Sequence, residues 1–579
     1  DLNTSFRTMK KNNICLVKVF IFFMSISYGK ELSVDESWKY LLDFNQASVH
    51  ATHHVNNIIR NGIIPESSDK INLLSDLGIK ISNNSLTPVA PNYLEEILET
   101  ENYYFHYTTD QSNDDAVSPI DLNNNSIPDY VETMSEIFEY VWIFFEDTLG
   151  YSLPLDDDQQ GRSQKYDIYI ENLPTNYFAI TYTSTFINES GTSCSSYIKM
   201  RNNYNGSVFQ SITELENIKI TAAHEFFHAI QFFYNCFERF WLMEATAVWS
   251  EDEIYNNIND HYRYMTTWFQ NSSRNIDDES NHMYGSFILF QYIDEHLGGP
   301  DMIKSIWEES RSRANSINDI SFVSIDEALS SIGSNFNNAL NSMRIANRIM
   351  SSHPNAEPYT YQEAEHYPVT APYEITSLTF NNNNPIVYEK NSLTLYSSNY
   401  IKLNILSPSR ILIENKDGPI TDLFGAIIYK HENGNNWTIR KGYDINIDPS
   451  INIEWATLIV SAQEQSEDDW DYKVTISDGY IEDLVVSSIY PNPFIYTNAR
   501  IRIKILSSIS QKIEISIYNI LGENIVKWSI DIAEPNEKVI FWDGKNSNRK
   551  IVSDGIYFIE ITGKNKRLVK KLTLLKSSD

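Results

Sequence analysis

The sequence predicts a multidomain protein in which an α+β domain is followed by two all-β sandwich modules. The chain has 579 residues, which is too many for one ordinary domain. Helical and strand-like segments mix as far as about residue 370, and short strand-like runs between turn residues then take over. Apolar residues form 42% of the chain and aromatic residues 13%, so several cores can be built.

The first segment, residues 1–29, has the pattern of an export signal. A basic start at Met9-Lys10-Lys11 precedes the short apolar run Ile14–Ile26, and Ser27 and Gly29 are the small residues that a signal peptidase requires. The run is too short to span a bilayer comfortably, so a cleaved signal is predicted. No later segment has the length and hydropathy of a transmembrane anchor, and none is expected in the mature chain.

Residues 30–100 are polar and partly helical, which fits either an N-terminal helical segment or a propeptide. His50, His53 and His54 lie here without an acidic or cysteine partner at ligand spacing, so they are expected on the surface. Further along, Cys194 and Cys236 could form one disulfide in an oxidising compartment, but the sequence does not decide whether they meet.

The α+β domain is expected over residues 101–370. Aromatic and β-branched residues predict two strands, and apolar periodicity predicts four helices. The strands are expected at 102–109 and 165–173, and the helices at 132–148, 212–234, 284–297 and 301–312. A β-sandwich follows at 371–480, and a second module of immunoglobulin-like size and alternation at 485–579.

The charge of the chain bears on its partners. The formal net charge is −32 and the pI is about 4.7. Such a field repels nucleic-acid phosphates, so nucleic-acid binding is not expected. The carboxylates either keep the chain soluble or are available to bind Ca²⁺.

A metal site is indicated by "TAAHEFFHAIQFFY", residues 221–234. Residues four apart share one face of a helix, so His224 and His228 can bind a single ion. Zn²⁺ suits imidazole nitrogen and keeps a water in catalytic sites. Glu225 follows the first histidine, where its carboxylate can take a proton from that water as general base.

The third ligand is expected at Glu244 in "RFWLMEATAVWSEDEIY". Apolar residues precede it, and an unpaired carboxylate would be costly in a buried helix unless it binds a metal. The alternatives Glu251, Asp252 and Glu253 follow Trp249 and have the pattern of a solvated helix end.

These segments together resemble known zinc enzymes. "HEFFH" followed by "WLMEATAVWSED" is similar to the gluzincin metallopeptidases, and more closely to a group of secreted bacterial zinc metallopeptidases with a later "YG" helix. The resemblance covers about residues 100–350. It implies a zincin-like catalytic domain, zinc held by His224, His228 and Glu244, Glu225 as general base, and a protein or peptide substrate.

The sequence departs from the gluzincin pattern at one position. Those enzymes carry an Asp four residues after the ligand glutamate to orient a histidine, and this chain has Val248 there. Glu251 or Asp252 could replace it. The developing oxyanion also needs a donor. His282 and Tyr284 precede a helix, and the resemblance favours Tyr284 as the catalytic donor.

A calcium loop is indicated by "DLNNNSIPDYVE", residues 121–132, which follows the 12-residue EF-hand spacing. Ser126 stands where glycine is usual, and the alternative is an Asn-rich turn before a helix. The loop resembles the single calcium loops of secreted bacterial proteins. The expected ligands are Asp121, Asn123, Asn125, the Ile127 carbonyl, Asp129 and Glu132.

The last module resembles the C-terminal sorting domain of the type IX secretion system. "IYPNPF" at 489–494 opens it, and "NILGENIV", "FWDGKN" and "SDGIYFIEI" follow in order. The resemblance implies contact with the outer-membrane secretion machinery and a secreted or cell-surface protein. An ordinary β-sandwich appendage is the alternative.

The motifs favour a secreted zinc-dependent endopeptidase with Zn²⁺ and Ca²⁺ as cofactors. The alternative is a non-proteolytic, calcium-binding surface adhesion protein with a degenerate protease domain, although the intact Glu225 speaks against it. Hydrolysis of a non-peptide amide or ester stays open, because zinc-activated water attacks any suitable carbonyl.

Overall fold

The computed structural model describes most of the chain. The described residues are 32–43, 50–82, 85–154, 165–174, 176–186, 192–313, 321–381, 384–432, 434–448, 452–463, 469–479, 484–496, 500–507, 510–532 and 536–576. The predicted signal at 1–29 lies outside them. Among the described helices, none has both the length and the hydropathy needed to cross a bilayer.

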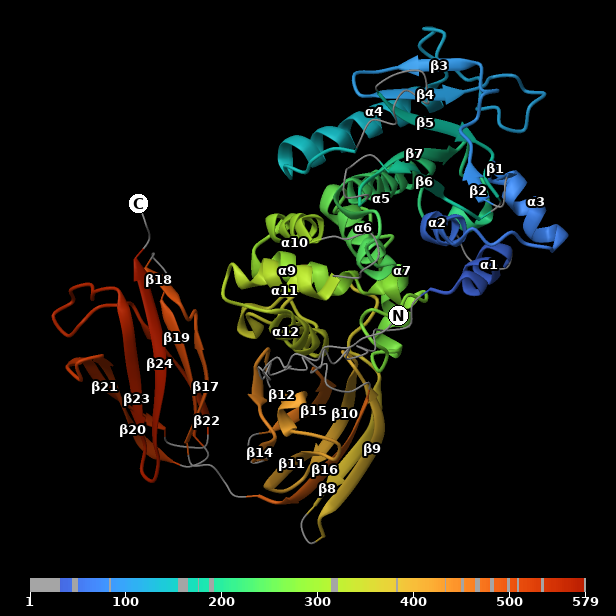
Figure 1. Cartoon of the computed structure of the whole chain (residues 1–579). Helices are drawn as coiled ribbons and strands as arrows, with labels where there is room; N and C mark the ends of the chain where they lie inside the picture. The colour runs from blue at the N-terminus through green and yellow to red at the C-terminus, as the bar shows by residue number, and fades with distance from the viewer. Residues whose placement is uncertain are drawn as a thin grey trace, which may run out of the picture.

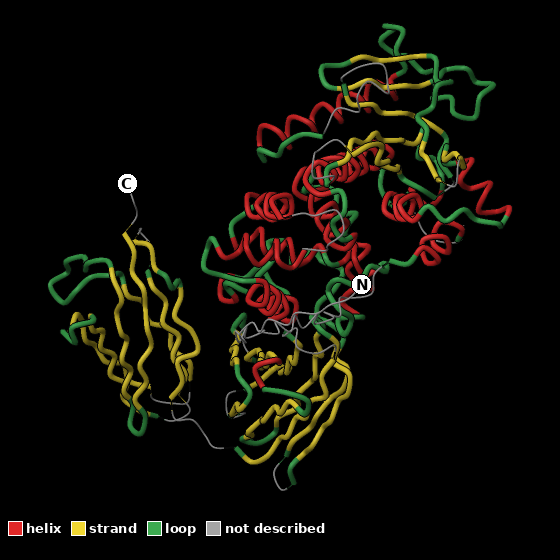
Figure 2. The backbone as a smooth tube through the Cα atoms, viewed as in Figure 1, coloured by secondary structure: helices red, strands yellow, loops and turns green. Residues whose placement is uncertain are grey.

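The protein is multidomain, with an α/β region toward the N-terminus and a strand-rich C-terminal part (Figure 1; Figure 2). The α/β region contains a five-stranded mixed sheet in the order β3-β4-β5-β7-β6. β4–β5 and β5–β7 pair in parallel, whereas β6 pairs antiparallel with β7 and forms one edge. The bounds are β3 Glu96–Glu99, β4 Tyr103–Tyr107, β5 Tyr166–Glu171, β6 Ala179–Phe186 and β7 Cys194–Arg201.

Helices surround this sheet and continue beyond it. The N-terminal elements are α1 Val34–Leu42, α2 Thr52–Asn61, α3 Ser68–Asp76 and the hairpin β1 Ile79–Ser82 with β2 Ser85–Pro88. The later helices are α4 Asp129–Ile143, α5 Glu214–Asn235, α6 Phe240–Ile254, α7 Tyr262–Gln270, α8 His282–Gly285, α9 Phe287–Leu297, α10 Pro300–Arg313, α11 Ser321–Ser330 and α12 Phe336–Ile349. The four helices and two strands predicted from periodicity are confirmed, with small shifts at their ends.

Helix α5 is the central helix of the α/β region. A capping box at its start joins Thr213 and Glu216, and acidic residues in the first turn favour the helix dipole. Almost the whole helix is buried, because it packs against β6 and β7 on one side and α4, α6 and α10 on others. A helix buried on nearly all sides has packing partners all round it, so its position is closely defined.

The next two sheets form a β-sandwich that rests on α12. One sheet has the order β13-β12-β15-β10-β8 and the other β14-β11-β16-β9, and their inner faces share a core. Ile345 and Ile349 of α12 pack on the outer face of the larger sheet. The strands are β8 Glu374–Phe380, β9 Ile386–Thr394, β10 Ser398–Ile405, β11 Ser409–Asn415, β12 Leu423–His431, β13 Trp437–Lys441, β14 Asp444–Ile447, β15 Ile453–Ala462 and β16 Asp469–Asp478.

The final module is a second sandwich with its own core. Its sheets have the orders β17-β19-β22 and β18-β24-β23-β20-β21, and isoleucines at alternate positions of β19, β20 and β23 meet between them. The strands are β17 Leu484–Tyr490, β18 Phe494–Tyr496, β19 Ile501–Ser507, β20 Gln511–Asn519, β21 Asn524–Ile532, β22 Asn536–Trp542, β23 Gly555–Thr562 and β24 Arg567–Lys576.

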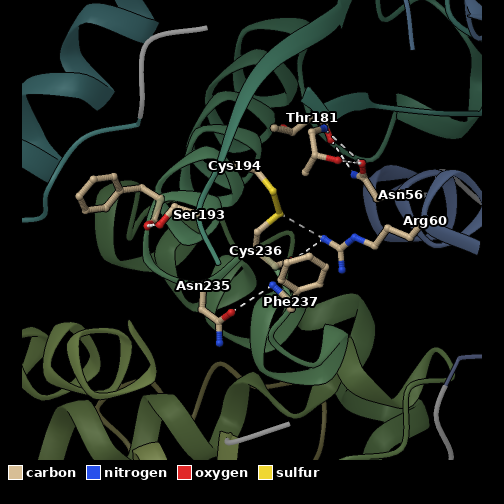
Figure 3. Close-up of a disulfide and its surroundings, with 10 residues drawn as sticks. Asn56, Arg60, Thr181, Ser193, Cys194, Asn235, Cys236 and Phe237 are labelled. Atoms are coloured by element: carbon tan, nitrogen blue, oxygen red, sulfur yellow. Dashed lines mark hydrogen bonds between the residues drawn. A yellow bond between two sulfur atoms is a disulfide. The ribbon is translucent and has the colours of Figure 1, made fainter. Parts of the chain in front are cut away.

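A disulfide joins the sheet to the end of α5. Cys194 at the start of β7 and Cys236, which caps α5, are bonded and buried, with Cα atoms 5.7 Å apart (Figure 3). The Cys236 amide also donates a hydrogen bond to the Thr192 carbonyl at 2.7 Å. The pairing that the sequence left open is therefore made.

We expect the double variant Cys194→Ser/Cys236→Ser to lose stability in the α/β region. The bond closes a loop with a sequence separation of 42, for which the chain-entropy relation gives about 4 kcal/mol. Urea unfolding followed by hydrogen exchange of the α5 amides measures the loss, and the C-terminal module provides the internal control. Equal protection of α5 in the variant and the wild type would contradict the expectation.

Candidate metal centre

Helices α5 and α6 bring three ligand atoms to one point. His224 and His228 lie one turn apart on α5, and Glu244 lies on the second turn of α6; all three are 0% exposed. The two Nε2 atoms are 3.0 Å apart, and Glu244 Oε2 lies 3.1 Å from His224 Nε2 and 3.8 Å from His228 Nε2. A tetrahedral zinc with bonds of 2.0–2.1 Å holds its ligand atoms about 3.3 Å apart. The three predicted ligands therefore fit one zinc ion.

Each imidazole is oriented from behind by an acceptor on its Nδ1 atom. Glu251 Oε1 accepts a hydrogen bond from His224 Nδ1 at 2.7 Å, and Gln231 Oε1 accepts one from His228 Nδ1 at 2.8 Å. Both Nε2 atoms then present lone pairs to each other unless one of them is protonated. A metal cation between them removes that repulsion, and such outer acceptors are usual around metal histidines.

The acidic residues near the end of α6 are not a solvated helix end, contrary to the expectation. Glu251 is 1% exposed and Asp252 6% exposed. Glu251 follows Glu244 by two helical turns, so both carboxylates face α5 and Glu251 replaces the Asp missing at Val248. The spacing of seven residues from Glu244 is the sequence signal that favours Glu251 over Asp252 as the residue that orients His224.

Glu225 follows the ligand His224, and only one of its two carboxylate oxygens accepts hydrogen bonds from the described residues. Thr52 Oγ1 and Thr181 Oγ1 donate hydrogen bonds to Glu225 Oε2 at 2.7 and 2.6 Å. Glu225 Oε1 has no hydrogen-bond partner among the described residues, and the side chain is 0% exposed. No pattern in the sequence pointed to either threonine, because both contacts join distant segments.

Of the two candidate donors before α9, only Tyr284 reaches the ligands. Its hydroxyl lies 3.4 Å from Glu244 Oε1 and 3.3 Å from the His50 carbonyl oxygen. His282 instead stacks on the Trp268 ring, with centroids 5.4 Å apart. Burial, together with the Glu244 carboxylate, holds the pKa of Tyr284 well above its usual value, so the phenol keeps its proton.

The electrostatics of the centre favour a bound cation. Burial lowers the pKa of His224, but Glu244 and Glu251 outweigh it and raise that pKa to about 10. Burial holds the pKa of His228 well below its usual range and raises those of Glu225 and Glu251, and it raises the pKa of Glu244 to about 7. Three buried carboxylates thus face one readily protonated imidazole, and a divalent cation would compensate them.

The three N-terminal histidines are buried, and the expectation of surface positions is wrong. His50, His53 and His54 are 3%, 0% and 2% exposed. His50 stacks on the His224 ring with centroids 3.9 Å apart, and His53 meets the His228 ring edge-on at 4.6 Å. The partners of His50 and His53 come from α5 and α6, far along the chain, so spacing within residues 30–100 could not reveal them.

The loop at 121–132 folds around its acidic and amide side chains. Asp121 accepts hydrogen bonds from the amides of Asn125 and Ser126, and Asp129 Oδ1 accepts one from the Leu122 amide at 3.0 Å. The side-chain amides of Asn123 and Asn125 donate to Glu132. Ser126 has a φ of 75°, in the left-handed region that favours glycine, where the EF-hand pattern places one.

Two sequence families match parts of the chain. Residues 83–323 match a "Family of unknown function (DUF6055)", and this stretch contains the predicted zinc ligands and the whole five-stranded sheet. Residues 488–575 match the "Secretion system C-terminal sorting domain". The type IX sorting domain predicted from the sequence is thereby confirmed. It directs the protein through the type IX secretion machinery to the cell surface or the exterior.

No curated protein matches the chain significantly, whereas several solved structures match short parts of it. PorZ of Porphyromonas gingivalis, an essential bacterial surface component of the type IX secretion system, is 15% identical over 15% of this chain and 11% of its own, with a TM-score of 0.12. Latent PorU of the same organism is 10% identical over 30% of this chain and 19% of its own, with a TM-score of 0.18. Parabacteroides merdae β-glucuronidase is 10% identical over 29% of this chain and 25% of its own, with a TM-score of 0.16. The chain thus spans a quarter or less of the length of each of these three proteins.

We expect Glu251→Ala to lower the zinc affinity of the chain by about 10–100-fold, because His224 loses the acceptor that orients it. Glu251→Gln should lose less, since its amide oxygen still accepts the Nδ1 hydrogen bond. Competition with a chromogenic chelator measures the affinity. Asp252→Ala, at the next buried position, is the matched control, and a loss as large as that of Glu251→Ala would contradict the assignment.

Proposed function

We propose that the chain is a secreted zinc-dependent endopeptidase with a zincin-like catalytic region. The observation that carries the proposal is the convergence of His224, His228 and Glu244 beside a carboxylate with one free oxygen, Glu225 Oε1. Three protein ligands and a neighbouring base are the arrangement that zinc hydrolases use. The sorting domain adds that the protein works outside the cell, where protein substrates are available.

The residues of the centre suit the hydrolysis of a peptide bond. When bound, zinc lowers the pKa of a water to about 7 and polarises the carbonyl that is attacked. Glu225 would take a proton from the attacking water through Oε1 and pass it to the leaving amine, while Thr181 of β6 holds Oε2. The protonated phenol of Tyr284, close to Glu244, can donate to the oxygen on which negative charge develops.

The antiparallel edge strand β6 supports a peptide as the substrate. An extended peptide can add to a free strand edge through main-chain hydrogen bonds. β6 lies at the edge of the sheet, and its Thr181 contacts the general base directly. Helix α2 covers this edge in the structure, and a peptide that replaced α2 along β6 would pass beside Glu225.

We expect Glu225→Gln to retain one zinc per chain and to lower the hydrolysis of casein by about 10²–10⁴-fold, because the general base is lost. Zinc content is measured by elemental analysis. Cleavage is measured on the intact chain and after limited trypsin treatment, since the ligands are buried. Glu216→Gln is the matched control, because glutamine also completes the capping box at the exposed start of α5.

Two results would count against this function. Zinc bound by the wild type without cleavage before or after trypsin treatment would favour the non-proteolytic adhesion protein, or an enzyme for another amide or ester. Equal cleavage by the wild type and Glu225→Gln would remove the proposed mechanism.

We also propose that residues 121–132 bind one Ca²⁺ ion. The supporting observation is the gathering of Asp121, Asn123, Asn125 and Glu132 in one tight loop, with Asp129 at its end. Carboxylate, amide and carbonyl oxygens are the ligands that Ca²⁺ prefers. The Ile127 carbonyl would be the backbone ligand.

We expect Asp121→Ala and Glu132→Ala each to weaken Ca²⁺ binding by at least about tenfold, because each removes a charged ligand. Calorimetric titration measures the affinity, and terbium luminescence gives a second reading. Leu122→Ala is the control, since Leu122 is 81% exposed and at a position without a ligand role. Equal affinities in the three variants would contradict a site in this loop.

A further inference from the structure

The N-terminal helices lie over the metal centre. Trp38 and Leu41 of α1 and Val55 and Ile58 of α2 share one apolar cluster with tyrosines that lie on or beside β5, β6 and β7. Figure 1 shows α2 beside β6, with α1 packed next to α2. The family match at 83–323 begins only after these helices, so they precede the unit that carries the ligands.

Helix α2 occupies the free edge of β6. Thr52 and Asn56 lie one turn apart on the same face of α2. The Thr181 amide donates to Thr52 Oγ1 at 3.0 Å, Asn56 Nδ2 donates to the Thr181 carbonyl at 2.8 Å, and the Thr183 amide donates to Asn56 Oδ1 at 3.2 Å. These are the main-chain groups that a paired peptide would use, so α2 excludes such a peptide.

The same helix places His53 against the metal ligands. His53 Nε2 lies 3.6 Å from Glu244 Oε1, and the ligand atoms of His53, His228 and Glu244 are all within 4.8 Å of one another. The ring is 0% exposed, and neither of its nitrogens has a hydrogen-bond partner among the described residues. Burying an unpaired imidazole is costly, and coordination to a metal would compensate it.

The adjacent His54 provides an internal contrast. It is equally buried and its two nitrogens also lack a hydrogen-bond partner among the described residues, but its ring stacks on Tyr40 of α1 with centroids 3.8 Å apart, away from the metal ligands. His54 also lines a cavity of about 310 Å³ between the N-terminal helices and the region of α7 and α8, together with Tyr40, Asn271 and His282. His53 is therefore the α2 histidine directed at Glu244 and His228.

Arg60 secures the other end of α2. Its guanidinium donates a hydrogen bond to the Cys236 carbonyl, beside the disulfide (Figure 3). The guanidinium also lies 5.5 Å from the centroid of the Phe240 ring. Helix α2 is thus held both at the strand edge and at the junction of α5 and α6, the two helices that supply the ligands.

We propose that His53 is a fourth protein ligand of the metal and that α2 thereby holds the chain in a latent form. The inference rests on the proposed metal centre of His224, His228 and Glu244. A catalytic zinc keeps one position for water, whereas four protein ligands close it. With His53 in place and Thr52 bound to Glu225, water and substrate are both excluded until α2 leaves.

The first test uses the intact chain loaded with zinc. X-ray absorption at the zinc edge counts the imidazoles through their scattering. We expect three imidazoles and one carboxylate. Two imidazoles would overturn the inference, and because this measurement needs no variant, it stands even if a substituted chain fails to fold.

The second test uses Co²⁺ as a spectroscopic probe in the full-length chain. The wild type and His54→Ala should show the intense visible bands of four-coordinate cobalt, unchanged by added azide. His53→Ala should change in intensity and respond to azide, and should release zinc to a chelator at least about tenfold faster. Spectra and release rates equal to those of the wild type would overturn the inference.

A third variant separates this inference from the proposed function. His224→Ala should abolish stoichiometric cobalt binding. If His224→Ala loses the metal while His53→Ala behaves as the wild type, the proposed metal centre is supported and only the assignment of His53 as a fourth ligand is rejected. If the wild type binds no metal, or His224→Ala binds it as well as the wild type, both the proposed function and the fourth ligand are overturned.

Discussion

The α/β region is organised around one point between α5 and α6, where two imidazoles and a carboxylate are buried together. Two Nε2 lone pairs and the Glu244 carboxylate lie within 4 Å of each other in a region without solvent exposure. Such a group of acceptors is unfavourable unless one imidazole is protonated or a metal cation lies among them. The surrounding residues then have clear roles, since Glu251 and Gln231 fix the imidazoles and Tyr284 approaches the carboxylate.

The geometry is held by connections at several levels of the fold. Gln231 Nε2 donates to the Met243 carbonyl and to Thr246 Oγ1, so the residue that orients His228 also ties α5 to α6. The buried pairs of Arg239 with Asp277 and Glu279 fix the start of α6. Metal sites tolerate errors of only a few tenths of an ångström, so this support is part of the site.

The sequence predicted the features that local periodicity controls. Four-residue spacing placed His224 and His228 on one face, and a buried helix pointed to Glu244, because helix geometry relates sequence distance to spatial distance. The positions of His50, His53 and Thr52 depend on α2 docking against strands more than a hundred residues away, which no local pattern encodes. Glu251 lies between these two cases. The sequence shows that it shares a helix face with Glu244, but the neighbouring acidic residues have the pattern of a solvated helix end, which led to the wrong prediction.

The contacts between α2 and β6 also affect association between molecules. An exposed strand edge with unpaired amides and carbonyls is a template for pairing with another chain, and native proteins commonly cover such edges. Thr52 and Asn56 cover this one with side chains, so the Thr181 and Thr183 main-chain groups are not free to pair with a second copy. Departure of α2 would therefore expose the β6 edge together with the metal centre. A second copy of the chain would then compete with the substrate for pairing with β6.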